Sequence, residues 1–370
     1  MSHLRPHSWL AAFPCVATAC LAPAEPRRVE IIPGNAYVQV GDSFQFELQV
    51  ALADPRAPQA PADGARWWVS DSTIAQIDSA SGLVVGRRAG SIAVSATVRG
   101  ATAGAQVVIA PAILVGAADI AACASSGDEA TAALLDAVSG TVFTAGDNVY
   151  ESGTYDEFTG CYDPSWGRHR ARTRPSPGNH EYLTPGAAGY FRYFGPAAGD
   201  PSRGYYSYDI GSWHIVVLNS SVDVRLGSAQ ETWLRADLAA QPARCTLAYW
   251  HYPRFSSGYG GDHLEMQPIW QALYDAGTDV VISGHDHDYE RFGPQTPSGS
   301  PDVIRGIREF VVGTGGKSLL AFLHNPPNSQ VRDNTTFGVL LLMLYDDHYE
   351  WRFVPTQGGG FTDAGGDTCH

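Results

Sequence analysis

Five short polar stretches, each after a run typical of a β-strand, constrain this chain more than any other feature. They are Asp119-Ile120-Ala121-Ala122, Gly146-Asp147-Asn148-Val149-Tyr150, Gly178-Asn179-His180-Glu181, His251-Tyr252-Pro253 and Gly284-His285-Asp286-His287. In open α/β sheets, ligands bind beyond the carboxyl ends of the strands. The five stretches together therefore predict an α/β fold with one site to which all of them contribute.

The side chains of these stretches are suited to two metal ions held side by side. The candidate ligands are carboxylate, phenol, amide and imidazole groups: Asp119, Asp147, Tyr150, Asn179, His251, His285 and His287. The carboxylate of Asp147 can bridge two ions, and a metal pair that shares a carboxylate is suited to phosphoryl transfer. Rings at His285 and His287 leave an extended segment on the same side, and Asp147 and Tyr150 share a face if a helical turn begins there.

The bulk composition narrows the choice of partners. The 370 residues leave room for two domains, and 44% hydrophobic with 17% charged residues is ordinary for a globular protein. The formal net charge of -14 argues against a nucleic-acid backbone as a partner. It does not exclude a small anionic substrate, because bound metal ions can reverse the local field.

Residues 1–22 have the pattern of an export signal. Arg5 precedes an apolar stretch from Trp9 to Val16, and small residues follow before Cys20. A lipoprotein signal, with Cys20 acylated, is a second interpretation, and in that case Cys20 is the one expected attachment to a membrane. No later run is long and apolar enough for a spanning helix. We expect a periplasmic, extracellular or lipid-anchored protein.

The cysteines predict disulfides in an oxidising compartment. Four of the six lie beyond the signal region, at 123, 161, 245 and 369, and four cysteines allow three pairings. Cys123 follows the first polar stretch and Cys161 the second, on loops that we expect to converge at one sheet edge. This favours Cys123–Cys161 and, by elimination, Cys245–Cys369. No Cys-x-x-Cys pair is present, which argues against a structural zinc site.

Residues 28–111 predict an all-β sandwich. Phe44, Phe46, Leu48 and Val50 alternate with polar residues, which indicates a half-buried strand. Further strands are expected at 67–69, 83–85, 92–98 and 106–109. The stretch from Trp68 through Gly82 to Gly90 resembles bacterial immunoglobulin-like domains of the second type. We interpret this region as a spacer or packing domain; binding of an unknown surface partner is the alternative.

Residues 112–370 predict an α/β sandwich of mixed sheets flanked by helices. A strand at 113–115, a helix at 129–138 and a strand at 141–144 form a unit that implies parallel pairing. Strands are expected at 206–210, 214–218, 246–250, 280–283, 309–312, 338–345 and 349–354, and helices at 230–239 and 264–276. The pairs 206–218 and 338–354 are expected to be hairpins.

This set of motifs resembles the calcineurin-like metallophosphoesterases and, within them, the purple acid phosphatases. Many relatives carry a metal-binding histidine two residues after the first aspartate, where this chain has Ala121. Tyr150 replaces that ligand, and the Tyr-Glu-Arg at 289–291 also matches the branch. The resemblance covers the chain from about Ala112 onward.

The resemblance implies how the ligands divide between two ions. The first would take Asp119, Asp147, Tyr150 and His287, and the second Asp147, Asn179, His251 and His285. The first set carries two anions besides the bridge and suits a trivalent ion, whereas the second suits a divalent ion. We therefore expect Fe(III) with Zn, Mn or Fe(II). A hydroxide between the ions would attack phosphorus in line with the leaving oxygen.

The acid on the leaving-group side is expected to be His180. It follows Asn179 directly and is the best candidate to stabilise the phosphoryl oxygens or to protonate the leaving group. Many relatives have a further histidine where this chain has Gly260. Either His263 substitutes for it or the second acid is absent.

Two other regions allow more than one interpretation. The spacing in the glycine-rich stretch 313–318 does not fit a phosphate loop, so we expect a turn that borders the metal site. Tyr155, Trp166, Tyr190 and Tyr193 either line a substrate pocket or pack in the interior.

The resulting functional hypothesis is an exported phosphatase that hydrolyses small phosphomonoesters. A phosphodiesterase acting on nucleotides or phospholipid headgroups uses the same metals and is the closest alternative. A non-catalytic surface binding protein is the third, although degenerate relatives usually lose ligands and all seven are present here.

Overall fold

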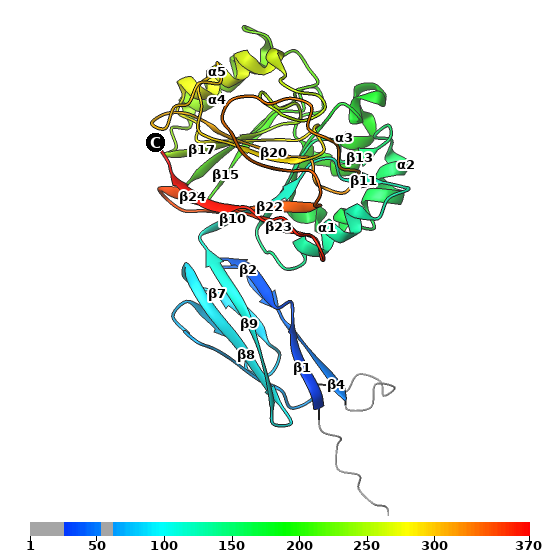
Figure 1. Ribbon diagram of the computed structural model, residues 1–370, viewed down its shortest axis with the longest axis vertical. Coiled ribbons are helices and arrows are strands. Elements are labelled where there is room, and N and C mark those ends of the chain that lie inside the picture. Colours follow the sequence, from blue (N-terminus) through cyan, green and yellow to red (C-terminus); the bar gives the residue numbers. More distant parts are fainter. Residues whose placement is uncertain (1–25, 53–61) are drawn as a thin grey trace, which may run out of the picture.

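The computed structural model describes residues 26–52 and 62–370. The predicted signal at 1–22, including Cys20, lies outside this range. Figure 1 shows a slender N-terminal β region below a larger, rounded region that contains the helices. None of the helices in the described ranges has the length and apolar character needed to cross a bilayer.

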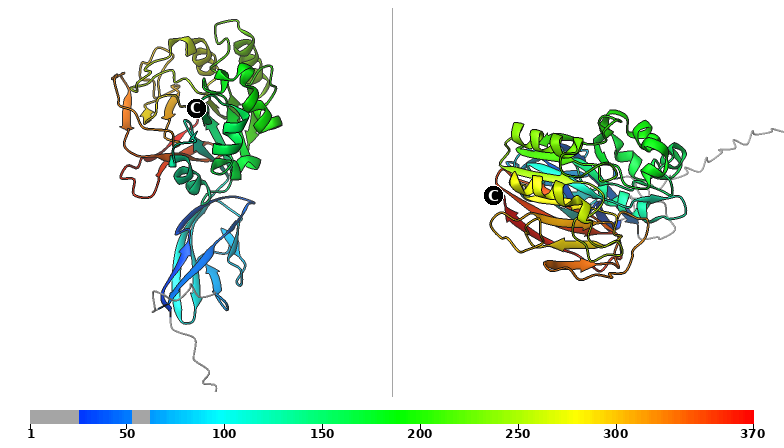
Figure 2. Two further views of the ribbon diagram at one scale, coloured as in Figure 1. Left: turned by 90° about the vertical axis from the view of Figure 1, so that its right-hand side faces the viewer. Right: turned by 90° about the horizontal axis from the view of Figure 1, so that it is seen from above.

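The N-terminal region is all β, as predicted. Its sheets have the orders β2-β9-β8-β5, β3-β7-β6 and β1-β4, and buried side chains such as Trp67, Val84 and Val107 fill the space between them. Figure 2 shows these strands running along the long axis of the region. The strands are β1 (Pro26–Ile32), β2 (Asn35–Gln39), β3 (Ser43–Gln45), β4 (Glu47–Leu52), β5 (Arg66–Val69), β6 (Ala75–Ile77), β7 (Leu83–Gly86), β8 (Gly90–Val98) and β9 (Ala101–Ala110).

The strand predicted across Phe44 to Val50 is wrong in one respect. Burial does alternate along it, and Phe46 is buried. The ladder nevertheless breaks at Phe46, because β3 pairs with β7 whereas β4 pairs with β1. One alternating run therefore contributes to two sheets, a change that periodicity alone does not reveal.

The larger region is built on two mixed sheets, as predicted. One has the order β14-β12-β10-β22-β23-β24 and the other β15-β16-β17-β18-β20-β19-β21. The strands are β10 (Ala112–Ala117), β11 (Ala121–Ala122), β12 (Thr141–Ala145), β13 (Val149–Tyr150), β14 (Thr173–Ser176), β15 (Tyr206–Ile210), β16 (Trp213–Val217), β17 (Cys245–Tyr249), β18 (Val280–Ser283), β19 (Tyr289–Phe292), β20 (Arg308–Val312), β21 (Ser329–Asp333), β22 (Gly338–Leu344), β23 (His348–Pro355) and β24 (Ala364–Thr368).

The two sheets share one core, and helices cover their outer faces. Along β16, Ile215 and Val217 belong to the core shared with the six-stranded sheet, whereas Val216 faces the cluster that contains Leu234 of α4 and Leu273 of α5. This is the period-2 alternation expected of a strand buried on both faces. The helices are α1 (Gly127–Leu135), α2 (Tyr155–Glu157), α3 (Ala188–Phe194), α4 (Ala229–Ala240) and α5 (Gln267–Asp275), with 3-10 turns that include η2 (Trp166–Arg172) and η3 (Glu181–Leu183).

Several predicted pairings are confirmed. β10 and β12 are parallel, and β15–β16 and β22–β23 are antiparallel hairpins. The strand before the third motif differs from the expected apolar run, because β14 contains Arg174 and Pro175. Its place at the edge of the six-stranded sheet explains why proline is tolerated.

Both favoured disulfides are present. Cys123 is bonded to Cys161, and Cys245 is bonded to Cys369. The second bond ties the residue that follows β24 to the start of β17, so it links the last strand of one sheet to the centre of the other.

The two regions meet at β2 and the turn after α1. Only Pro111 separates β9 from β10. The amide of Tyr37 donates to the Ala137 carbonyl at 3.0 Å, and the Ser139 amide donates to the Tyr37 carbonyl at 2.8 Å. The side-chain oxygen of Gln39 accepts from the Ile113 amide at 3.0 Å. These bonds fix the N-terminal region against the first strand–helix unit of the larger one.

Candidate metal centre

The candidate ligands stand just beyond the ends of five strands. Asp119, Asp147, His251 and His285 each lie two residues past the end of β10, β12, β17 and β18, respectively. Asn179 lies three residues past β14. The carboxyl ends of these strands meet at the cluster, the arrangement expected of ligand sites in α/β sheets.

Three of these positions have backbone conformations that are rare for residues with a side chain. The φ angles of Asp119, Asp147 and His285 are 59°, 47° and 69°. Gly146 has φ 86°, and a Cβ there would lie 2.6 Å from the His251 ring. Left-handed residues that are not glycine cluster at functional sites, because the surrounding structure must hold them in place. The extended segment assumed for His285 and His287 is therefore wrong, although both rings face the cluster.

One half of the cluster converges on the phenol of Tyr150. Its hydroxyl oxygen lies 2.6 Å from Asp119 Oδ1, 2.9 Å from Asp147 Oδ2 and 3.2 Å from His287 Nε2. Asp147 and Tyr150 do meet, but the helical turn that was the condition for this is not formed. Instead, β13 pairs in parallel with β11, and this ladder places the phenol beside the carboxylates.

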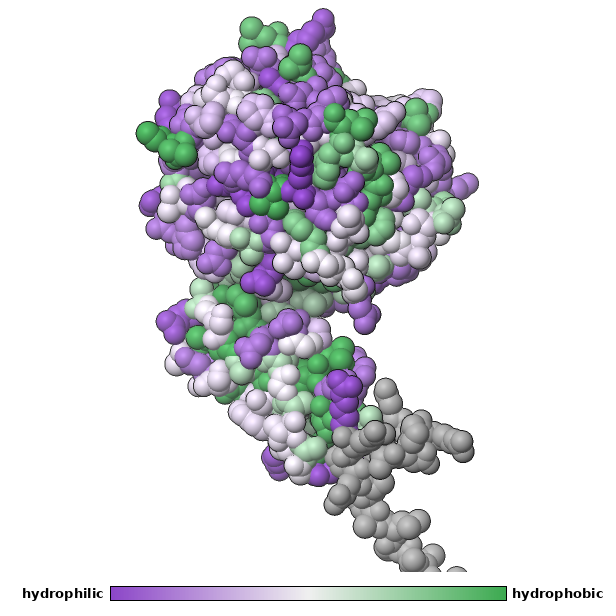
Figure 3. Space-filling model, viewed as in Figure 1, coloured by the Kyte–Doolittle hydropathy of each residue, from purple (hydrophilic) through white to green (hydrophobic). Residues whose placement is uncertain are grey.

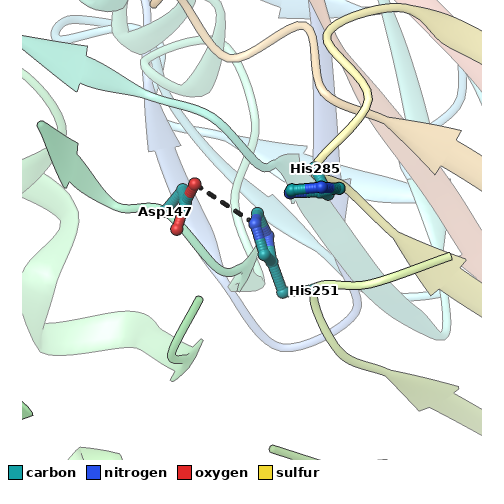
Figure 4. A group of neighbouring side chains, drawn as sticks. All are labelled: Asp147, His251 and His285. Carbon is teal, nitrogen blue, oxygen red and sulfur yellow. Dashed lines mark ion pairs between the residues drawn. The ribbon is translucent and has the colours of Figure 1, made fainter. Parts of the chain in front are cut away.

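The other half converges on His251. Its Nε2 lies 3.2 Å from Asp147 Oδ2 and 3.0 Å from Asn179 Oδ1. Figure 4 shows His285 beside Asp147 and His251. One ligand atom from each of these three residues lies within 4.8 Å of the other two. The same Asp147 oxygen thus contacts both halves.

Hydrogen bonds outside the cluster orient two of the imidazoles. Nδ1 of His251 lies 2.9 Å from the Ala145 carbonyl, which makes it the donor and leaves Nε2 free to face the cluster. Nδ1 of His287 lies 2.7 Å from the Ser318 hydroxyl. The amide of Lys317 donates to the Asp119 carbonyl at 3.0 Å. The glycine-rich stretch 313–318 is therefore the predicted turn beside the cluster.

Burial and charge shape the titration of the cluster. Burial alone would lower the pKa of His251, but the Asp147 carboxylate raises it to about 9. Burial and the neighbouring His251 lower the pKa of His285 to about 3. Burial, together with the Asp119 and Asp147 carboxylates, raises the pKa of Tyr150 well above its usual value. The carboxylates thus favour positive charge at the cluster, and only a strongly charged cation would make Tyr150 a phenolate.

A buried glutamate that the sequence analysis did not single out holds two of the loops together. The fully buried carboxylate of Glu181 accepts hydrogen bonds from the amides of Asp147, Asn148, Val149 and Gly178, at 2.7 to 3.3 Å. Burial and the nearby Asp147 raise its pKa to about 7. The only signal in the sequence was its position two residues after the candidate ligand Asn179. Its hydrogen bonds to the amides of the second motif depend on the fold.

His180 lies at the edge of the cluster. Its Nδ1 is 2.6 Å from the Glu151 carbonyl, so Nε2 is the nitrogen left to face the cluster, 3.9 Å from Asp147 Oδ2. Its ring stands 4.3 Å from the Tyr150 ring. Lys317 also lies over the Tyr150 ring, with its Nζ 4.6 Å from the ring centroid. The same Nζ forms an ion pair with Glu151.

His263 lies close to the cluster without joining it. Its ring stacks on Tyr252 at 4.5 Å and stands 5.1 Å from the His285 ring, while Nδ1 is 2.8 Å from Glu265 Oε1. A Cβ at Gly260 would lie 3.2 Å from His285 Cδ2. The glycine therefore leaves little room for a larger residue in this conformation, and His263 is the nearest imidazole on that loop.

The aromatic region around the third motif mostly packs. Trp166, Tyr190 and Tyr193 are buried, and the two tyrosines belong to a set of rings that includes Phe158 and Phe194. Tyr155 is only partly buried and lies under the guanidinium of Arg192. The pocket interpretation is therefore wrong for the three buried side chains.

Comparison with known proteins agrees with this architecture. Residues 118–289 match the family of calcineurin-like phosphoesterases, and residues 27–109 match the bacterial Ig-like domain (group 2). Purple acid phosphatase 18 of Arabidopsis thaliana is 33% identical over 166 residues, which are 42% of this chain and 37% of that protein. Purple acid phosphatase 22 of the same plant is 32% identical over 160 residues, 40% of this chain and 36% of that protein.

The chain therefore spans little more than a third of the length of these curated relatives. Among solved structures, a purple acid phosphatase from yellow lupin (Lupinus luteus) seeds shares the fold, with a TM-score of 0.57 and 16% identity over 90% of this chain and 73% of that one. The protein joins an N-terminal bacterial Ig-like domain to a calcineurin-like phosphoesterase domain whose relatives include purple acid phosphatases.

Proposed function

We propose that this protein is a dimetal phosphatase that hydrolyses small phosphomonoesters. The observation that carries the proposal is the position of Asp147 Oδ2, which lies 2.9 Å from the Tyr150 hydroxyl and 3.2 Å from His251 Nε2. A single carboxylate oxygen between two sets of donors is an arrangement suited to a bridged metal pair.

The donor chemistry fits two unequal ions. Asp119, Tyr150 and His287 around the shared Asp147 form an anionic set, which favours a trivalent ion such as Fe(III). Asn179, His251 and His285 add only neutral donors, which favour Zn, Mn or Fe(II). When bound, the ions supply the Lewis acidity that polarises a phosphoryl group and acidifies water.

The chain's own residues orient the substrate and move a proton. His180 is one-quarter exposed, with Nδ1 anchored to the Glu151 carbonyl. Its free Nε2 can donate a hydrogen bond to a phosphoryl oxygen or a proton to the departing alkoxide. Glu181 keeps the second and third motifs at a fixed separation.

Metal analysis of matched variants tests the division into two sets. We expect two ions per wild-type chain and about one per chain in both His287→Ala and His251→Ala. The two variants should retain different metals, iron in His251→Ala and the divalent ion in His287→Ala. Two ions in both variants, or the same metal lost from both, would contradict the assignment.

Turnover of an aryl phosphate and of its bis-aryl ester tests the reaction. We expect the monoester to have the higher kcat/KM, and His180→Ala to lower it by roughly 10²- to 10⁴-fold. Preference for the diester would instead assign a phosphodiesterase. Inactivity of the fully metallated protein on both esters would assign a binding protein.

We further propose that the protein is exported. Both disulfides join residues distant in sequence, and such bonds persist in oxidising compartments. Cell fractionation should recover the protein outside the cytoplasm. Mass spectrometry of the first residue of the mature protein should distinguish a cleaved protein without lipid from one that is acylated at Cys20. A cytoplasmic protein with all cysteines reduced would contradict the proposal.

A further inference from the structure

In the larger region, most of the exposed large hydrophobic side chains lie around the candidate metal centre. Within residues 112–370, all of which the structure describes, eight are exposed. Six of them lie on loops at the end of the sheets that carries the cluster, exposed by 37% to 75%: Leu183, Leu226, Tyr259, Leu264, Leu320 and Leu323. We call these six residues the apolar rim. Figure 3 shows hydrophobic residues in small separate groups on the face that it presents.

Backbone contacts place parts of the rim next to the candidate ligands and His180. The amide of Leu320 donates to the His287 carbonyl at 2.9 Å, and that of Leu183 donates to the His180 carbonyl at 3.3 Å. Tyr259 lies between Gly258, which approaches Asp286, and Gly260, which approaches His285. A single exposed leucine is ordinary, but several on different loops around one site indicate a binding surface.

One part of the rim is a formed pocket. Leu226, Leu264 and Pro268 line a surface pocket of about 410 Å³, together with Glu265. Glu265 is bonded to His263, whose ring is 5.1 Å from the His285 ring. Two side chains, Glu265 and His263, therefore separate the pocket from the candidate ligand His285.

Three cations near the rim are already paired, whereas Arg332, beside Phe322 and His324, donates only to the His324 carbonyl. Arg225 and Arg235 border the pocket, but Arg225 pairs with Asp223 at 2.6 Å and Arg235 pairs with Asp275 at 3.1 Å. Lys317, on the other side of the cluster, pairs with Glu151. A second anionic group, such as the further phosphates of a nucleotide, finds no unpaired cation among these three.

We propose that the apolar rim selects phosphate esters whose alcohol is an extended apolar group, such as an alkyl chain. This inference rests on the proposed phosphatase function and names its substrate class. The phosphate would lie at the cluster. The alkyl chain of the ester would be shielded from water by packing along Leu320 or by entering the pocket between Leu226 and Leu264.

A chain-length series tests the proposal, because the leaving-group pKa hardly changes from ethyl to octyl phosphate. We expect kcat/KM of the metallated full chain to rise at least tenfold over the series, with a ceiling of about fourfold per fully buried CH₂. Leu264→Ser and Leu320→Ser should flatten this dependence. Ile304→Ser is the matched control. Ile304 is also exposed, but it lines a pocket with Asp279, which precedes the first residue of β18, whereas the cluster lies beyond the last residue of that strand.

Binding of the corresponding n-alkylphosphonates, measured by calorimetry, needs no turnover. Tighter binding with chain length in an inactive protein would support the rim and overturn the phosphatase proposal. Active protein with no dependence on chain length, or a dependence unchanged in both leucine variants, would overturn the rim. Binding to phosphatidylcholine vesicles that is lost in both leucine variants would also overturn it, in favour of docking to a lipid surface.

Discussion

The phenol oxygen of Tyr150 lies 2.9 Å from Oδ2 of Asp147, and both side chains are buried. Burial and the two carboxylates raise the pKa of this phenol, so it would ionise only against a strongly charged cation. A phenolate bound to Fe(III) absorbs visible light through charge transfer.

Tyr150→Phe should therefore remove a visible absorption band from the purified, iron-loaded protein. The loss of a single donor from the anionic set should leave the other set's metal in place. Spectra of wild type and variant, with iron measured in both, check this. A colourless, iron-free wild type that is still active would contradict the iron assignment but not the dimetal one.

Glu181→Gln should destabilise the protein. An amide has one acceptor oxygen where the carboxylate has two, so some of the four backbone amides now bonded to Glu181 would lose their partner while buried. We expect a loss of about 1–3 kcal/mol in the free energy of unfolding. Urea unfolding measures it, with Glu350→Gln, on the exposed side of β23, as the control. Equal midpoints would show that Glu181 does not hold the loops.

His169 should make the folded state sensitive to acid. Burial and the Arg172 guanidinium, which donates to His169 Nδ1 at 3.2 Å, lower the pKa of His169 to about 4 and outweigh the Asp136 carboxylate, 3.0 Å from Nε2, which raises it. Because the pKa of His169 is lower in the folded state than in the unfolded state, its contribution to the free energy of unfolding is present above about pH 6.5, the pKa in the unfolded state. That contribution is lost as the pH falls toward 4. The contribution is at most about 3 kcal/mol.

His169→Gln should accordingly lose less stability than wild type between pH 7 and pH 4.5. The free energy of unfolding at the two pH values measures the difference. His348→Gln, at a partly exposed histidine, should keep the wild-type dependence. Parallel profiles for wild type and His169→Gln would contradict the prediction.

The disulfide Cys245–Cys369 should stabilise the fold more than Cys123–Cys161. The bonded residues are 124 and 38 positions apart, and loop entropy gives about 5 and about 4 kcal/mol. Paired Cys→Ala variants, compared by urea unfolding without reductant, test the order. A midpoint that reductant leaves unchanged in wild type would mean that neither bond constrains the unfolded chain.

The class of fold and the grouping of the candidate ligands at one sheet edge were predictable because they follow from local patterns. The period of the apolar residues identifies strands β10, β12, β17 and β18, and parallel strands present their carboxyl ends at one edge. The same reasoning led to the disulfide Cys123–Cys161, since its cysteines follow two of those strands.

Contacts between distant residues account for what the pattern missed. One ladder ends before Phe46 and another begins after it because the partner strands β7 and β1 belong to different sheets. β14 has no apolar pattern because an edge strand tolerates Pro175. Tyr150 reaches Asp147 through the β11–β13 ladder rather than a helical turn.

The sequence alone therefore specifies which side chains can bind metal and in what order they occur, because chemistry and periodicity are local properties. The left-handed backbone at Asp119, Asp147 and His285, the clamp of Glu181 across two motifs, and the apolar rim exist only in the folded chain. They depend on which loops meet in space, and packing between sheets determines that.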